Sequence, residues 1–381
     1  MMGSSPQHGT SLQMPSKEEL DVEEEMTNLL IREKMLHFKL SNRGLRSVPA
    51  VVMATPGLKS IDLGFNKLTV LPGDLIIKFA PTLRSLTLWN NLLVALPPEI
   101  VLCTNLTELK VGNNHIPILP EKLGSMQSLL KFDASGNRIT ELPRTLSHLQ
   151  ELTLLDLSRN KLPACEDDNL WTLTNVTKLS IAGNLLSKIP LAVACLTDLR
   201  ILNAGANQIT ELEPDLVKLP YLEELHLADN LIRHLPGPCW RYATNLKTLD
   251  LCNNCLASLP NQLGYVTNLT FLGMTRNDRL APRLIEAMNR GLPFLLQAMR
   301  DLTVEFEIEE DHVSAVARMH EERKQRRKVM MESLLSGNSG QNDGVERFYR
   351  ELLALSVQGE EEEVEKARER LAKRMLNTHA Q

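Results

Sequence analysis

The sequence predicts an α/β solenoid, a curved horseshoe of stacked repeats with a parallel sheet on its concave face. Three observations predict this fold class. One phrase recurs eleven times between Met35 and Leu280, at a spacing of 23 to 25 residues. Within the phrase, leucine or another apolar residue takes the first, fourth, sixth and eleventh places, and asparagine takes the ninth. Most copies then continue into Leu-Pro. A unit this short cannot bury its own apolar face, so consecutive units must stack.

The first six places of each copy predict a short strand. Apolar residues at the fourth and sixth places alternate with polar neighbours, which indicates one buried and one exposed face. At the ninth place, a side-chain amide can donate and accept hydrogen bonds where the chain leaves the strand and its backbone is buried. Arg43 takes this place in the first copy, and the other ten copies carry Asn66, Asn91, Asn114, Asn137, Asn160, Asn184, Asn207, Asn230, Asn254 and Asn277.

A Leu-Pro or Ile-Pro pair follows the eleventh place in seven copies. Proline fixes φ and removes a backbone donor, which suits a turn into an irregular or short helical return segment. The pairs are Leu71-Pro72, Leu96-Pro97, Leu119-Pro120, Leu142-Pro143, Ile189-Pro190, Leu235-Pro236 and Leu259-Pro260.

This phrase resembles the leucine-rich repeat, and its 23-residue Leu-Pro form is similar to the Ras-group intracellular class. The resemblance covers residues 35–282. It implies a non-catalytic scaffold or adaptor in intracellular signalling that binds a partner protein on the concave face. It also implies a Ras-type small GTPase, or another component of its pathway, as the partner.

Outside the repeats, the pattern changes to helical spacing and to charged or polar stretches. From Pro282, apolar residues recur at intervals of three and four, which predicts a helical cap. In the sixth copy, an early Leu162-Pro163 and the acidic run from Glu166 to Asp168 predict a local bulge. The expected segments are a disordered 1–16, a capping helix at 17–34, eleven repeats at 35–282, a helical cap at 283–302, and a charged helical tail at 303–381 with a flexible linker near 336–344.

Composition and motifs argue against catalysis. A net charge of −5 gives no global attraction for nucleic acid. The sequence has no glycine-rich phosphate loop, zinc-binding His-Glu-x-x-His or nucleophile elbow. Cys252 and Cys255 form a Cys-x-x-Cys, but both stand at variable places and no second pair accompanies them. We therefore expect no catalytic residues, no cofactor, no metal and no nucleic-acid partner.

Several features predict a cytoplasmic protein. The six cysteines are scattered through the array and do not form flanking disulfide caps. Residues 1–16 are mostly polar, and no apolar stretch is long enough to span a bilayer. The basic run from Arg323 to Lys328 has several readings, including a nuclear import signal, a lipid contact, an RNA contact and a solvated helix face.

Partner specificity should reside at the second, third, fifth, seventh and eighth places, which we expect to be exposed along the strands. Phe65 and Trp89 take the eighth and seventh places of adjacent repeats, and Arg84 takes a second place. Aromatic residues beside arginine often anchor interfaces. The alternative is that the two rings only pack on each other.

A charged strip is the second predicted part of the binding surface. It consists of Lys110, Asp133, Asp156, Arg159, Arg200, Glu224, His226, Asp229 and Asp250. Asp133 and Asp156 should lie on neighbouring strands as like charges, with Lys110, Lys131 and Arg159 as compensation. Mixed signs favour a charged protein partner over a phosphate backbone.

Two further functions remain open. A phosphatase regulatory subunit is one, although such arrays usually have shorter repeats without regular Leu-Pro. A structural component of a cytoskeletal or ciliary assembly, joined through its terminal helices, is the other. The recognition half of an enzyme with a C-terminal catalytic domain ranks last, because about eighty mostly charged residues after the cap leave little room for a catalytic core.

Overall fold

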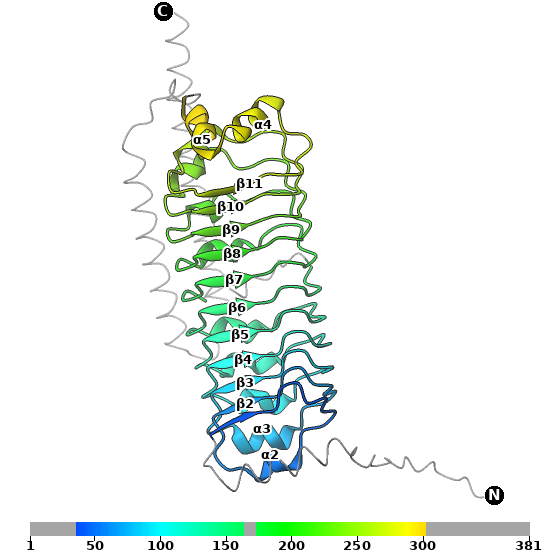
Figure 1. The fold of residues 1–381 in the computed structure, drawn as a ribbon. Coiled ribbons are helices and arrows are strands. Elements are labelled where there is room, and N and C mark those ends of the chain that lie inside the picture. Colours follow the sequence, from blue (N-terminus) through cyan, green and yellow to red (C-terminus); the bar gives the residue numbers. More distant parts are fainter. Residues whose placement is uncertain (1–35, 164–172, 302–381) are drawn as a thin grey trace, which may run out of the picture. The chain divides into compact units, whose positions relative to one another are not determined.

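The computed structural model describes residues 36–163 and 173–301. Its eleven strands form one parallel sheet in sequence order, with one strand from each repeat (Figure 1). The predicted solenoid is therefore confirmed. The strands cover only the third to fifth places and are β1 His37–Lys39, β2 Ser60–Asp62, β3 Ser85–Thr87, β4 Glu108–Lys110, β5 Lys131–Asp133, β6 Leu154–Asp156, β7 Lys178–Ser180, β8 Ile201–Asn203, β9 Glu224–His226, β10 Thr248–Asp250 and β11 Phe271–Gly273.

Short helices form the return segments. Most begin directly after a proline, such as Pro72, Pro97 or Pro143, whose fixed φ suits the entry to a helix. This confirms the role predicted for Leu-Pro. The α-helices are α2 Ala50–Ala54 and α3 Gly73–Phe79, and the 3₁₀ helices are η1 Pro98–Leu102, η2 Glu121–Ser125, η3 Arg144–His148, η4 Leu191–Cys195, η5 Leu216–Lys218, η6 Pro238–Tyr242 and η7 Asn261–Tyr265.

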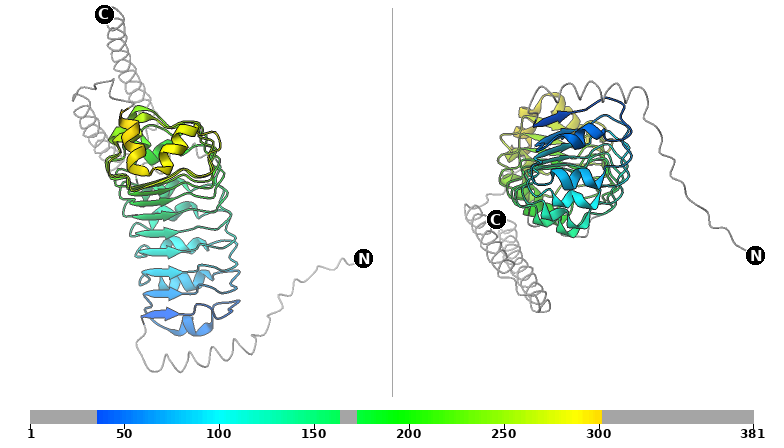
Figure 2. Two further views of the ribbon diagram at one scale, coloured as in Figure 1. Left: turned by 45° about the horizontal axis from the view of Figure 1, so that its top comes forward. Right: turned by 90° about the horizontal axis from the view of Figure 1, so that it is seen from below.

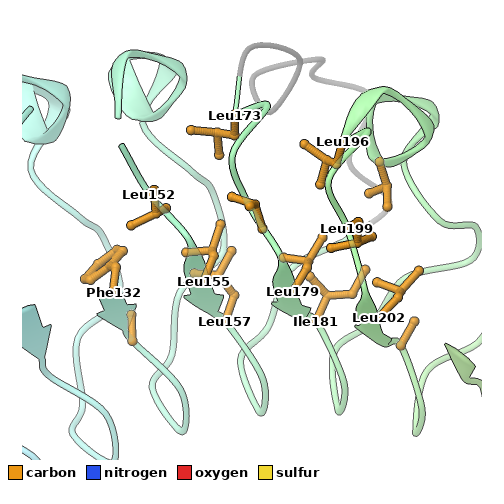
Figure 3. Close-up of a cluster of buried hydrophobic side chains, with 14 of the residues drawn as sticks. Phe132, Leu152, Leu155, Leu157, Leu173, Leu179, Ile181, Leu196, Leu199 and Leu202 are labelled. Carbon is orange, nitrogen blue, oxygen red and sulfur yellow. The ribbon is translucent and has the colours of Figure 1, made fainter. Parts of the chain in front are cut away.

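The core is a continuous layer of leucine between the sheet and the return segments. In the sixth repeat, Leu152, Leu155, Leu157 and Leu162 are all at most 1% exposed. Figure 3 shows how such side chains from successive repeats interdigitate between the strands and the return segments. Each repeat thus buries its apolar face against both neighbours, as the period requires.

The ninth-place asparagines are buried and join one repeat to the next. The Asn160 amide donates to the carbonyl oxygens of Leu157, in its own repeat, and Ala134, in the preceding one, both at 3.0 Å. Its side-chain oxygen accepts the backbone N–H of Ile139 in the preceding repeat, also at 3.0 Å. The other nine asparagines repeat these bonds, so the column forms a ladder along the solenoid.

Two helices close the C-terminal end of the array, as predicted. They are α4 Pro282–Asn289 and α5 Leu292–Asp301, which lie side by side over the last repeats (Figure 2). The α5 helix buries Leu295, Leu296 and Met299. Its backbone also packs closely on Gly264, where an added Cβ would lie 2.7 Å from the carbonyl oxygen of Leu296.

Several predictions fall outside the described residues. They are the disordered residues 1–16, the helix at 17–34, the bulge near Glu166, and the tail from 303 with its linker and basic run.

Replacing Asn160 with alanine should lower the free energy of unfolding by roughly 2–4 kcal/mol, because it leaves buried backbone groups without partners. Urea unfolding followed by circular dichroism measures the change. The control is Asn105→Ala, since the Asn105 amide makes an exposed bond to the Pro81 carbonyl. Equal losses in the two variants would contradict a special role for the ladder.

Candidate functional site

The exposed surface of the sheet, here called the sheet face, carries the side chains of the second, third, fifth and seventh places. These side chains are half-buried or exposed along most strands, whereas the fourth and sixth places are buried. The sheet face thus presents a different set of side chains in every repeat on a constant backbone.

The eighth place lies in a left-handed turn beyond the strand, not on the strand as we expected from the sequence. Its φ is between 52° and 65° in all eleven repeats described, where asparagine, aspartate and glycine are the usual residues. Phe65 and Arg159 each have φ 55°. The stack enforces this conformation, because the backbone N–H of Phe65 donates to the carbonyl oxygen of Trp89 in the next repeat at 2.8 Å.

Phe65 and Trp89 do lie together. Their ring centroids are 4.8 Å apart with an interplanar angle of 55°. The Trp89 indole also lies over Gly112, where an added Cβ would come within 2.7 Å of its Cδ1 atom. Phe65 nevertheless remains 52% exposed. The rings therefore pack on each other and still present an apolar surface to solvent.

Arg84 does not lie beside this aromatic pair. It stands at a second place, five residues of extended chain before Trp89, or about 16 Å along the strand direction. Its neighbour is Lys59 at the second place of the preceding repeat, whose carbonyl oxygen accepts the Arg84 backbone N–H at 2.7 Å. The predicted cluster thus separates into an aromatic end and a cationic end.

Asp133 and Asp156 face each other in register on β5 and β6, as predicted. One oxygen of each accepts a backbone N–H two residues on, at 3.0 Å from Ser135 and 2.9 Å from Ser158. These carboxylates therefore stabilise the turn after the strand, a role that we did not anticipate.

Lys110 lies in register with Asp133 on the neighbouring strands β4 and β5, as predicted, but its ion pair is with another carboxylate. Lys110 pairs with Glu108 of its own strand at 2.9 Å. The hydrogen bond from Lys110 lowers the pKa of Glu108. The positive charges of Lys110 and Lys131 lower it further. His226 lies on β9 with its Nε2 atom 3.1 Å from Glu224. Arg159 stands in the sixth repeat and His226 in the ninth, three and six repeats from Trp89.

Arg200 of the predicted strip belongs to a charged triad in the row of second places, whose other two members we did not predict. Glu223 accepts a hydrogen bond from Lys247 at 2.5 Å and from Arg200 at 2.7 Å. These bonds, that of Lys247 first, lower the pKa of Glu223. Opposite charges at the same place of three successive repeats are the sequence signal that could have revealed it.

Exposed apolar side chains also gather on the edge that follows the asparagine turn in the second to fourth repeats. Leu92, Val94, Val70 and Ile118 are 41%, 57%, 65% and 56% exposed. They stand at the tenth, twelfth and thirteenth places, which the fifth repeat fills with Arg138, Thr140 and Glu141. We did not consider these places, because they lie beyond the strand.

The five cysteines among the described residues, which exclude Cys165, are free. Burial raises the pKa of the Cys103 and Cys239 thiols to about 11. The described residues contain no group of three or more potential metal ligands. Within the same residues, no helix is long and apolar enough to cross a membrane.

Arg159→Asn should raise the free energy of unfolding by about 1 kcal/mol, because asparagine tolerates the left-handed conformation better. Thermal unfolding measures the change. Arg138→Asn, at an exposed position without positive φ, is the matched control. A lower unfolding temperature for Arg159→Asn would show that contacts of the arginine side chain offset the free-energy cost of the left-handed backbone.

Cys103 and Cys239 should react slowly with a thiol reagent in the native state. A pKa two units above the reference value lowers the thiolate fraction about 100-fold near pH 8, and burial blocks access as well. Peptide mass spectrometry after timed labelling compares them with the half-buried Cys195, Cys252 and Cys255. Labelling of all five at one rate would contradict the burial.

Comparison with known proteins agrees with this geometry. A family model described as leucine rich repeat matches residues 81–139, 104–162 and 220–278. Among solved structures, an internalin from Listeria monocytogenes is 17% identical with a TM-score of 0.58, covering 71% of this chain and 84% of the internalin. At that identity, the likeness shows the fold alone.

Two other solved structures are more similar in sequence. YopM, a leucine-rich effector protein from Yersinia pestis, is 27% identical with a TM-score of 0.52, covering 67% of this chain and 66% of YopM. The Arabidopsis receptor kinase HAESA, solved with the peptide hormone IDA and the co-receptor SERK1, is 28% identical with a TM-score of 0.53. That match covers 60% of this chain and 39% of HAESA. No curated protein matches. The repeat phrase, the eleven-stranded sheet and the family match over residues 81–162 and 220–278 together show that this chain folds as a leucine-rich repeat solenoid.

Proposed function

We propose that this protein is a non-catalytic scaffold that binds a partner protein on its sheet face, with Phe65 and Trp89 at the centre of the interface. Leucine-rich repeat proteins are usually non-catalytic binding modules. The observation that carries the proposal is Phe65 itself. It holds a large aromatic ring in a left-handed turn and leaves half of it exposed. Exposed aromatic rings are frequent anchors of interfaces.

The surroundings of the pair support an interface in the second to fourth repeats. Leu92, Val94, Val70 and Ile118 add exposed apolar surface on the edge beyond the asparagine turn. Contiguous apolar surface on a monomer often marks a binding site. The solved structure of HAESA is a complex with a peptide hormone and a protein co-receptor, which fits a protein or peptide ligand for this array.

The resemblance to the Ras-group class makes a Ras-type small GTPase, or a component of its pathway, the partner we would test first. Binding to the GTP-loaded form alone would support this assignment, whereas indifference to such GTPases would remove it. We also expect a cytoplasmic location, with which five free cysteines are consistent.

Trp89→Ala and Phe65→Ala should each remove the main partner from affinity captures made in native cells with the full chain. The matched control is Phe271→Ala, which removes an aromatic ring that is 50% exposed at the other end of the same sheet. Quantitative mass spectrometry compares the captured proteins. If both variants keep every partner that the Phe271 control keeps, the interface lies elsewhere.

Gly112→Ala tests the orientation of the indole without removing it. The new Cβ would lie 2.7 Å from the indole Cδ1 and 2.8 Å from a carboxylate oxygen of Asp133, so it would displace Trp89 and should reduce capture as strongly as Trp89→Ala. Gly205→Ala is the control, because Gly205 also stands at the seventh place of its repeat. The nearest atom to its added Cβ is the Ala228 carbonyl oxygen at 3.0 Å, and no aromatic ring is among the nearest atoms. Unchanged capture by Gly112→Ala would contradict a role for the indole orientation.

A further inference from the structure

We infer that the sheet face of the second and third repeats binds a short, extended, acidic segment of the partner. This inference rests on the proposed function. An apolar side chain of that segment packs on Phe65 and Trp89. A carboxylate about five residues away meets Lys59 and Arg84.

Lys59 and Arg84 form an uncompensated pair of cations. They are exposed neighbours in the row of second places, and neither has a carboxylate partner among the described residues. In the same row, the cations of the eighth and tenth repeats do have a carboxylate partner, because Glu223 bridges Arg200 and Lys247. A carboxylate from a partner can occupy the equivalent position beside Lys59 and Arg84.

The N-terminal part of the array as a whole is basic. Between residues 36 and 105, which include the second and third repeats, lysine and arginine outnumber aspartate and glutamate by seven to three. Between residues 106 and 163 the same count is seven to six. Most of this excess lies in the first repeat, which contains Lys39, Arg43 and Arg46 but no aspartate or glutamate in its sequence, next to the repeats that carry the aromatic pair.

The two ends of the surface are joined by small side chains. On β2 and β3, Ser60, Ser85 and Thr87 stand between the cations and the rings, together with Asp62. One oxygen of Asp62 accepts the Gly64 backbone N–H at 3.0 Å. The cations and the rings are about 16 Å apart, a distance that about five residues of extended chain span.

The basic surface is too short for a nucleic-acid track. A single strand needs cations that continue along its backbone. In the row of second places, Arg84 is followed by Thr107, Leu130 and Thr153, which are neutral. The neighbouring fifth places carry Asp133 and Asp156, which would repel phosphates. An acidic protein segment fits these charges better.

The test is a selection of random short peptides on the purified full chain, followed by fluorescence anisotropy of the selected peptides. We expect an apolar residue and a carboxylate about five positions apart. Lys59→Glu/Arg84→Glu should weaken binding about tenfold or more and should select basic peptides instead. Trp89→Ala should also weaken binding. Lys178→Glu, an exposed lysine on the same face, is the control and should have little effect.

The outcomes separate this inference from the proposed function. Binding that depends on Trp89 but tolerates the charge reversal overturns the acidic segment and leaves the protein interface in place. Binding that tolerates the charge reversal and Trp89→Ala overturns the acidic segment and the interface of the proposed function. Selection of no peptide, or tighter binding of an oligo(dT) strand than of any selected peptide, also overturns the acidic segment.

Discussion

Burial of the backbone where each repeat leaves its strand is the constraint on which the structure depends. The chain turns there inside the protein, and water cannot satisfy its N–H and C=O groups. The ninth-place asparagine satisfies them and at the same time bonds to the preceding repeat, as Asn160 does with Ala134 and Ile139. One side chain therefore closes its own turn and sets the position of its neighbour, so no repeat is complete without the next.

The surface follows from that ladder. Because the turn is held in place, the eighth residue adopts the left-handed conformation in every described repeat, whatever its side chain. The turn directs the Phe65 ring toward Trp89, and the absence of a side chain at Gly112 leaves room for the indole. The aromatic pair is thus positioned by bonds between repeats and not by the local preference of either residue.

The sequence predicts the stacked-repeat architecture of this protein well and the arrangement of its surface side chains less completely. The period, the apolar places and the asparagine column are enough to predict eleven stacked strands, and Pro282 marks the change to the cap. The left-handed eighth place was missed, although asparagine, glycine or aspartate fills it in seven of the eleven repeats and is the usual residue in that conformation. The distance between Arg84 and Trp89 was misjudged, because residues close in sequence lie far apart along an extended strand. The turn bonds of Asp133 and Asp156 were hidden, because a charged side chain on a strand suggests a solvent contact first.

The left-handed turn has a consequence for how such a surface can change over evolutionary time. Since neighbouring repeats hold the turn, a residue with a poor local preference adds a small cost and does not unfold the array, as Phe65, Arg159 and Arg276 illustrate. Each repeat therefore offers one position beside the sheet face at which a new side chain can be tried almost independently of the others. Recognition can be altered one repeat at a time while the fold stays constant.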